Sequence, residues 1–164
     1  MAKTHGPHGP LIFGILRRMD AQRDMSEVLA IESDSFEFPW SEEDFRRCLD
    51  QRNVGALVLE QGDRVVGYMI FDERCKRLHL LNLAVHADRR RRGVAGSLIS
   101  VLAAHVRSGM RKGILAEVRE TNLGAQLFFK SLGFRAVSVL KDFYDDTDED
   151  AYLFQYPVEG EVRP

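Results

Sequence analysis

The spacing of hydrophobic residues changes along the chain between the alternation of a β-strand and the three-to-four-residue interval of a helix. Apolar spacing and cap signals predict helices at residues 24–35, 42–50, 93–109 and 123–132. Runs rich in β-forming residues predict strands at residues 11–19, 54–60, 64–71, 77–85, 114–119, 134–140 and 151–156. This order predicts a mixed α/β fold with three layers, in which helices cover both faces of a mostly antiparallel sheet.

Short sequence signals mark where these elements begin and end. The Gly-Asp pair at 62–63 stands between two β-rich runs, as in a two-residue hairpin turn. Ser41, with Asp44 three residues later, has the spacing of a capping box at the start of the second helix. Gly133 follows the fourth helix, where a glycine can adopt the left-handed conformation that ends a helix. The run at 77–85 is almost continuously apolar, which predicts a central strand covered on both faces.

The composition fits one globular domain that needs no disulfides or metals for stability. The 164 residues carry 23 basic and 25 acidic side chains, a net charge of −2, and 45% of them are hydrophobic. At this length about 70% of the surface of the unfolded chain can be buried. We expect one domain over residues 11–157, with a flexible N-terminal tail at 1–10, where glycine and proline break regular structure, and a C-terminal tail at 158–164.

Charge, cysteine content and hydropathy exclude several classes of protein. A near-neutral net charge argues against a protein that binds nucleic acid by neutralising phosphates. The 2 cysteines form neither a disulfide framework nor a C-x-x-C pair, so we expect no metal site, and a reducing cytoplasm fits best. No apolar run is long enough for a membrane span or for the core of a signal peptide. We therefore expect a cytoplasmic protein without nucleic-acid or membrane partners.

A segment of arginines and small residues connects the central strand to the long third helix. It consists of Arg90, Arg91, Arg92, Gly93, Val94, Ala95 and Gly96. Small residues let a phosphate approach the backbone, and the free N–H groups in the first turn of a helix attract an anion together with the helix dipole. The segment lacks the Gly-Lys-Ser/Thr of a Walker loop and the three glycines of a dinucleotide fingerprint. It predicts a pyrophosphate cradle; the alternative is a glycine-containing turn with solvated arginines.

The chain resembles the GNAT superfamily of N-acetyltransferases in four segments, which are Leu81-Asn82-Leu83-Ala84-Val85, Arg90-x-x-Gly93-x-Ala95, Glu117-Val118-Arg119-x-x-Asn122 and Leu132-Gly133-Phe134. It resembles the RimI branch, the ribosomal-protein-alanine N-acetyltransferases, in two further segments, Ile31-Glu32-x-x-Ser35-Phe36 and Pro39-Trp40, taken together with Glu117-Val118-Arg119. The resemblance spans residues 11–157. It implies the GNAT fold and an enzyme that transfers an acetyl group from acetyl-CoA to an amine.

The resemblance also implies which residues hold acetyl-CoA. The thioester is expected in a splay between the strands at 81–85 and 115–119. The backbone around 83–85 is expected to hold the pantetheine arm, and the N–H groups of 91–96 the pyrophosphate. The implied cofactor-binding residues are Leu83, Ala84, Val85, Arg90, Arg91, Arg92, Gly93, Val94, Ala95, Gly96, Asn122 and Phe129.

Glu117 occupies the place of the general base in the RimI family. Transfer to an amine needs a group that accepts the proton of the amine. Alternation along the strand puts Glu117 on one face with Leu115, opposite Ala116 and Val118, so a charge lies on a strand that helices should cover. The alternative for Glu117 is a structural ion pair with an arginine, for example Arg119 on the same face.

Phe129 departs from the family pattern, because relatives carry a tyrosine there that protonates the CoA thiolate. A phenyl ring has no proton to donate. Either the thiolate leaves with the help of water, or another group replaces the tyrosine, or the protein binds acetyl-CoA and catalyses poorly. The candidate replacements are Tyr144, which matches a tyrosine on the substrate-side loop of the family, and His79, which stands where some relatives carry a catalytic tyrosine. The alternative for His79 is a satisfied core residue.

The acceptor that the resemblance implies is a protein N-terminus, such as that of a ribosomal protein. An acidic run at 142–150 falls where family members receive the peptide and is expected to attract basic peptides; the alternative is a solvated loop. Two other functions stay open. One is acetylation of a small amine, since one cofactor scaffold serves many acceptors, and the other is a non-catalytic acyl-CoA-binding regulatory module. We expect a monomer or a weak homodimer.

Overall fold

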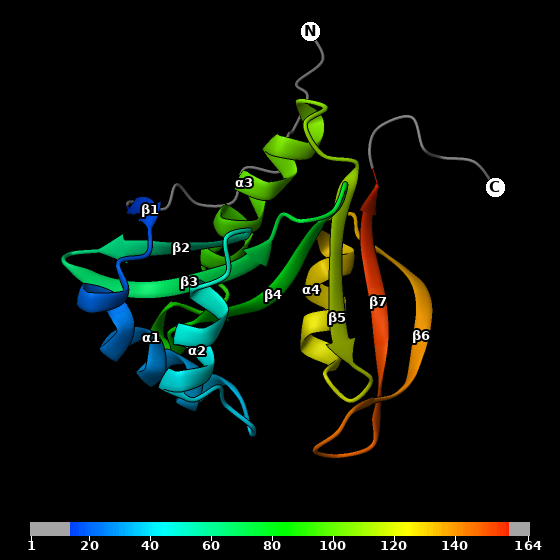
Figure 1. Cartoon of the computed structure of the whole chain (residues 1–164), viewed down its shortest axis with the longest axis horizontal. Helices are drawn as coiled ribbons and strands as arrows, with labels where there is room; N and C mark the ends of the chain where they lie inside the picture. The colour runs from blue at the N-terminus through cyan, green and yellow to red at the C-terminus, as the bar shows by residue number, and fades with distance from the viewer. Residues whose placement is uncertain (1–13, 158–164) are drawn as a thin grey trace, which may run out of the picture.

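The computed structural model describes residues 14–157, which form one sheet with helices on both faces (Figure 1). The strands are β1 (Ile15–Arg18), β2 (Val54–Gln61), β3 (Arg64–Asp72), β4 (Leu78–Val85), β5 (Gly113–Arg119), β6 (Arg135–Tyr144) and β7 (Glu149–Pro157). The helices are α1 (Ala21–Ser35), α2 (Glu42–Leu49), α3 (Val94–Arg107) and α4 (Leu123–Ser131), with a 3-10 turn η1 (Ala87–Arg89) before α3. The two predicted tails and positions 11–13 of the predicted first strand lie outside the described residues.

The sheet has the order β1-β2-β3-β4-β5-β7-β6. All neighbouring strands are antiparallel except β4 and β5, which run parallel. A parallel pair needs a crossover connection, and η1 with α3 supplies it. The predicted mixed, mostly antiparallel fold is confirmed, and each predicted helix or strand overlaps an observed one.

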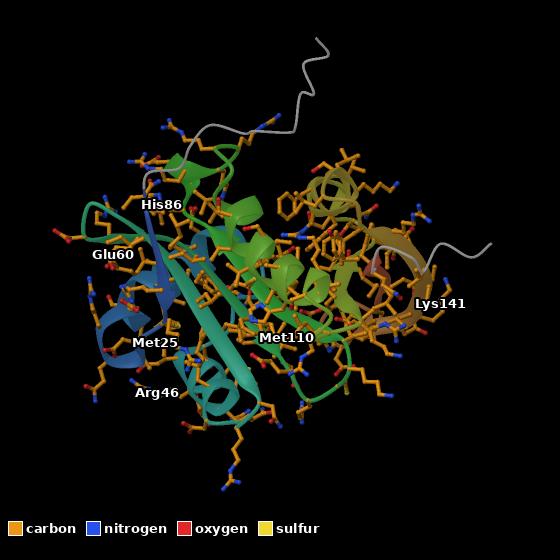
Figure 2. All side chains as sticks on the ribbon, turned by 90° about the horizontal axis from the view of Figure 1, so that it is seen from above. Met25, Arg46, Glu60, His86, Met110 and Lys141 are labelled. Carbon is orange, nitrogen blue, oxygen red and sulfur yellow. The ribbon has the colours of Figure 1, made fainter. Side chains whose placement is uncertain are left out.

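The sheet separates two hydrophobic cores. The α3 and α4 side contains the larger core, in which Leu98 is fully buried. The α1 and α2 side contains the second core, in which Phe45 is fully buried. β4 contacts both α1 and α3, so it is the central strand that the sequence predicts. Seen from above (Figure 2), Met25 of α1 and Lys141 of β6 lie toward opposite ends of the molecule.

The turn, the helix cap and the helix end predicted from the sequence all have the expected backbone geometry. The 62–63 turn joins β2 to β3 with φ angles of 56° and 59°, as a type I′ hairpin turn requires. Ser41 and Asp44 form both hydrogen bonds of a capping box at the start of α2. Gly133, with φ of 88°, follows α4 in the left-handed conformation.

The acidic run at 142–150 forms the end of a β-hairpin, and Asp142, Asp145, Asp146 and Asp148 in it are exposed to solvent. β6 and β7 extend into this run and leave only a tight turn between them. Arg119 binds Asp146 and Glu149 at 2.6 and 2.7 Å, and a β6 lysine binds Asp150 at 2.5 Å. These ion pairs partly neutralise the negative charge of the run. The run should therefore attract basic peptides less strongly than its composition suggests.

Glu32 of α1 is a buried carboxylate, 1% exposed, that joins four parts of the fold. Its Oε1 accepts a hydrogen bond from the backbone N–H of Trp40 at 2.8 Å, and its Oε2 accepts one from the hydroxyl of Tyr68. The amide of Asn82 donates to both oxygens, at 3.3 and 3.2 Å. A buried charge costs free energy unless such donors surround it. Glu32 thus connects α1 to β3, to β4 and to the loop between α1 and α2.

We expect Tyr68→Phe to lower the free energy of unfolding by about 1–3 kcal/mol, because Glu32 remains buried and loses one donor. Urea denaturation followed by circular dichroism measures this change. Tyr156→Phe is the matched control, since the ring of Tyr156 packs on Phe134 and keeps this contact without the hydroxyl. Equal losses of stability in the two variants would contradict the role given to the Tyr68 hydrogen bond.

Candidate active site

β4 and β5 separate after only three paired positions. Their parallel pairing runs from Leu78 with Ile114 to Leu80 with Ala116. Beyond these residues the two strands continue without pairing and diverge (Figure 1). A cleft of about 1390 Å³ contains this opening, and both strands contribute to its walls. The splay predicted between the two strands is therefore present, and it begins one residue after Leu80.

The separation leaves one edge of β4 open to the cleft. The N–H of His86 donates to the carbonyl of Val66 on β3 at 2.9 Å. The N–H and C=O groups of successive residues point to alternate edges of a strand. Since His86 points its N–H toward β3, Leu83 and Val85 point their N–H and C=O groups the other way, toward the splay. The carbonyl of Val85 accepts a hydrogen bond from Arg90 Nε at 3.0 Å. The other backbone groups along this edge can bind an extended ligand that carries amides, as predicted for the pantetheine arm.

The turn before α3 forms the second part of the cleft. Gly93 precedes the helix with φ of 84°, a conformation that favours glycine. The first hydrogen bond inside α3 runs from the N–H of Ser97 to the carbonyl of Gly93 at 2.9 Å. The N–H groups of residues 94–96 therefore lack partners within the helix, and these residues line the cleft. A Cβ added to Gly96 would meet no atom within 4 Å, so a phosphate has room beside the helix terminus.

A carboxylate and an imidazole meet where the strands separate. Glu117 Oε2 of β5 lies 2.5 Å from His79 Nε2 of β4. The Glu117 side chain is 16% exposed and lines the cleft, whereas the His79 side chain is 39% exposed and is not among the lining residues. The hydrogen bond to Glu117 raises the pKa of His79 despite burial, because it stabilises the imidazolium. The ion pair of Glu117 with Arg119, the alternative considered from sequence, is wrong, since Arg119 binds the β6–β7 hairpin instead.

Tyr144 lines the cleft from the end of β6. Its ring lies 3.8 Å from the guanidinium carbon of Arg119. Burial is the main reason that the pKa of Tyr144 is raised; the Glu117 carboxylate raises it further, and Arg119 opposes the increase. Tyr144 therefore keeps its proton at neutral pH and can donate it inside the cleft.

Comparison of the sequence with known families agrees with this geometry. Residues 25–134 match the Acetyltransferase (GNAT) family. The chain belongs to this family. The match includes the diverging strands, the turn before α3, and both Glu117 and His79. It confirms the predicted fold class, the acetyl transfer and the use of acetyl-CoA as the acetyl donor.

Individual relatives agree with the family assignment. The acetyltransferase is 28% identical over 137 residues to the [ribosomal protein bS18]-alanine N-acetyltransferase of Escherichia coli K12, covering 82% of this chain and 92% of that protein. The crystal structure of the Escherichia coli ribosomal-protein-S18-alanine N-acetyltransferase has a TM-score of 0.79 at 24% identity, covering 93% of this chain and 99% of that chain. The structure of Arabidopsis thaliana NAA60 in complex with acetyl-CoA has a TM-score of 0.75 at 21% identity, covering 88% and 99%.

The arginines of the acetyltransferase's cradle segment differ in where they lie. The guanidinium of Arg90 also donates to Asp34 and Ser35, each at 3.0 Å, so this side chain fixes the end of α1 beside the turn. Arg91 lines the cleft, with φ of 59°, whereas Arg92 is not among the lining residues. The backbone of the turn and the Arg91 side chain therefore face the cleft, whereas the Arg90 side chain is bound to the end of α1.

Asn122 and Phe129 both line the cleft of the acetyltransferase from the α4 side. Asn122 caps α4, since its Oδ1 accepts a hydrogen bond from the N–H of Ala125 at 3.0 Å. Phe129 is 6% exposed and packs with Phe134 and Phe154. Phe129 is therefore part of the core under the cleft and offers shape but no proton.

Two residues of the site make contacts that the sequence did not indicate. Glu32 lines the cleft and holds the loop between α1 and α2, and Arg119 holds the hairpin on the other side. Both occur in the segments that resemble the RimI branch, so their positions were visible. Their partners lie far away in the chain, and only the folded structure brings these partners together.

Within residues 14–157, no helix is both long enough and apolar enough to cross a membrane. The same part of the chain contains no group of three or more His, Cys, Asp or Glu residues placed to hold a metal ion.

We expect Gly96→Asp to weaken CoA binding at least about tenfold, because a carboxylate would occupy the space beside the α3 terminus and repel the pyrophosphate. The fold should survive, since the added Cβ meets no atom and an acidic residue in the first turn of a helix is favourable. Calorimetry measures the affinity. Gly96→Ala is the matched control and should lose little affinity. Unchanged CoA binding by folded Gly96→Asp would remove the pyrophosphate assignment.

Proposed function

We propose that this acetyltransferase acetylates the N-terminal α-amine of a protein or peptide, with Glu117 as the general base. The observation that carries the proposal is the half-buried Glu117 carboxylate, which faces the cleft where β4 and β5 separate. An attacking amine must lose a proton, and a carboxylate held at that point is within reach of an acceptor that enters the splay.

The two residues of the Glu117–His79 pair have different roles in this proposal. Glu117 accepts the proton of the acceptor, and His79 Nε2, at 2.5 Å, receives it from the carboxylate when the imidazole is neutral. Because His79 is 39% exposed, it can release the proton to solvent outside the cleft. The raised pKa of His79 makes it a better proton acceptor than an ordinary histidine. Acetyl-CoA, when bound, supplies the activated acetyl thioester.

Tyr144 is the proton donor in the proposal, because Phe129 cannot act as one. Tyr144 lines the same cleft, and its raised pKa keeps the phenol protonated until the CoA thiolate leaves; the phenolate that forms then regains a proton from solvent. The position of Tyr144 on the β6–β7 hairpin differs from that of Phe129 on α4, so the donor comes from the acceptor side of the cleft.

An α-amine suits this site better than a lysine side chain. The α-amine has an ordinary pKa of about 7.7–8.0 and lysine one of about 10.4, so far more α-amine is neutral at physiological pH. The acceptor end of the cleft lies between the α1–α2 loop, with Phe38 and Trp40, and Tyr144 of the hairpin. The Escherichia coli relative is named for the alanine of ribosomal protein bS18, which supports a protein N-terminus that begins with alanine. A cytoplasmic location accords with such a substrate.

We expect Glu117→Gln to lower kcat about a hundredfold to ten-thousandfold, because the amide keeps the size of the side chain but cannot accept the proton. The affinity for acetyl-CoA should change little. Steady-state release of the CoA thiol, with calorimetry for binding, measures both. Glu120→Gln is the control, since Glu120 is exposed and is not among the residues that line the cleft. Full activity of Glu117→Gln would exclude Glu117 as the base.

We expect peptides that begin with alanine to have a kcat/KM at least about tenfold higher than an N-terminally blocked lysine peptide or spermidine, from the difference in amine pKa. Basic residues after the first position should help only modestly, because part of the hairpin's charge is bound by Arg119 and a lysine. A thiol-release assay at low and high salt compares these acceptors. Preference for spermidine would indicate a small-amine enzyme, and binding of acetyl-CoA without turnover on any acceptor would indicate a regulatory module.

A further inference from the structure

Arg119 is the last residue of β5, two residues after Glu117 on the same face of the strand. Its side chain is 24% exposed, and it lines the cleft at the acceptor end. The acetyl transfer proposed above does not involve this guanidinium. Its contacts nevertheless involve both of the segments between which an acceptor must enter.

The guanidinium is bound on one side by the β6–β7 hairpin. Its Nη1 donates to Thr147 Oγ1 at 2.8 Å and to Glu149 Oε2 at 2.7 Å, and its Nη2 donates to Asp146 Oδ2 at 2.6 Å. The hydroxyl of Thr121 donates to the second oxygen of Glu149 at 2.5 Å. A single exposed ion pair contributes little, but a planar guanidinium held by three groups fixes the geometry of all of them.

The same guanidinium contacts aromatic rings from two segments. Its carbon lies 3.8 Å from the centre of the Tyr144 ring on the hairpin and 5.5 Å from that of the Phe38 ring on the α1–α2 loop. Both distances lie within the range of a cation–π interaction. The α1–α2 loop and the hairpin lie at the same end of the molecule, where β4 and β5 diverge (Figure 1). Arg119 thus contacts both walls of the acceptor entrance.

We propose that Arg119 is a positioning residue that orients Tyr144 and joins the α1–α2 loop to the β6–β7 hairpin, so that the acceptor entrance keeps one shape. Arg119 touches neither acetyl-CoA nor the reacting amine in this proposal and acts through Tyr144 and Phe38. The part that concerns proton donation rests on the proposed function of Tyr144, whereas the part that concerns the shape of the entrance does not.

The charges around Tyr144 make the proposal measurable without turnover. Arg119 and Glu117 on β5, Asp146 in the turn and Glu149 on β7 all influence the Tyr144 phenol. The three carboxylates favour the protonated phenol, and Arg119 alone among these four favours the phenolate. Loss of the Arg119 charge must therefore raise the pKa of Tyr144 and make the phenol a weaker acid.

The experiment compares Arg119→Met, which removes the positive charge, with Arg119→Lys, which keeps the charge but replaces the planar guanidinium with an ammonium group. Tyrosine labelled with ¹³C at Cζ reports the titration of Tyr144 by NMR, and Tyr144→Phe identifies its signal. We expect the Tyr144 pKa to rise by about one unit or more in Arg119→Met and to stay near the wild-type value in Arg119→Lys. Both variants should raise the KM for the acceptor peptide about tenfold, and calorimetry should show unchanged CoA affinity.

A double-mutant cycle separates positioning from general stability. In the Tyr144→Phe background, Arg119→Met should cause little further loss of kcat, because the two residues act together. Arg135→Met on β6 is the matched control, since Arg135 is exposed and is not among the residues that line the cleft. An unchanged Tyr144 titration in folded Arg119→Met, or an equal loss of kcat with and without Tyr144, would overturn the proposal. If the wild type acetylates no peptide, the proposed function fails, while the titration still tests the contact between Arg119 and Tyr144.

Discussion

The end of hydrogen bonding between β4 and β5 is the constraint on which the rest of the site depends. Two strands in the middle of a sheet normally satisfy each other's backbone groups, yet these strands separate after Leu80 and Ala116. Backbone donors and acceptors on β4 are left facing a cleft instead of a neighbouring strand. A ligand with amide groups can supply the missing partners, and the same opening gives an amine access to Glu117. α1 and α3 both pack against β4 beside this opening.

The cleft has opposite electrostatic character at its two ends. At the α3 end the free N–H groups of residues 94–96 and the helix dipole favour a pyrophosphate. At the other end, carboxylates of Glu32, Glu117 and Glu149 lie in or beside the cleft, and each has a defined partner. Buried charges without such partners would be costly. In the proposed mechanism these partners also matter, since the imidazole beside Glu117 receives its proton and the guanidinium beside Tyr144 influences the pKa of the phenol.

Most helices and strands, and the position of the candidate site along the chain, could be predicted from the sequence, because the signals for them are local. Hydrophobic periodicity identifies the helices and strands, and glycine or serine at a cap identifies their ends; both depend on residues within one or two turns. The family motifs locate the cradle and Glu117 for the same reason, since each occupies one short segment. Alternation along β5 correctly separates the face of Leu115 and Glu117 from that of Ala116 and Val118, because strand geometry requires it.

Contacts between distant segments could not be predicted in this way. Alternation along the strand puts Arg119 on the face of Glu117 and makes it one candidate partner, but the parallel register of β4 and β5 places His79 there instead, 38 residues away in the chain. The sequence likewise does not show that Arg119 binds Asp146 and Glu149 in the acidic run at 142–150. Glu32, Tyr68 and Asn82 meet only because α1 packs on β3 and β4. The sequence by itself determines which elements form and which face each side chain takes; the register between strands and the packing of helices on them decide which charges meet, because these depend on contacts that no local pattern encodes.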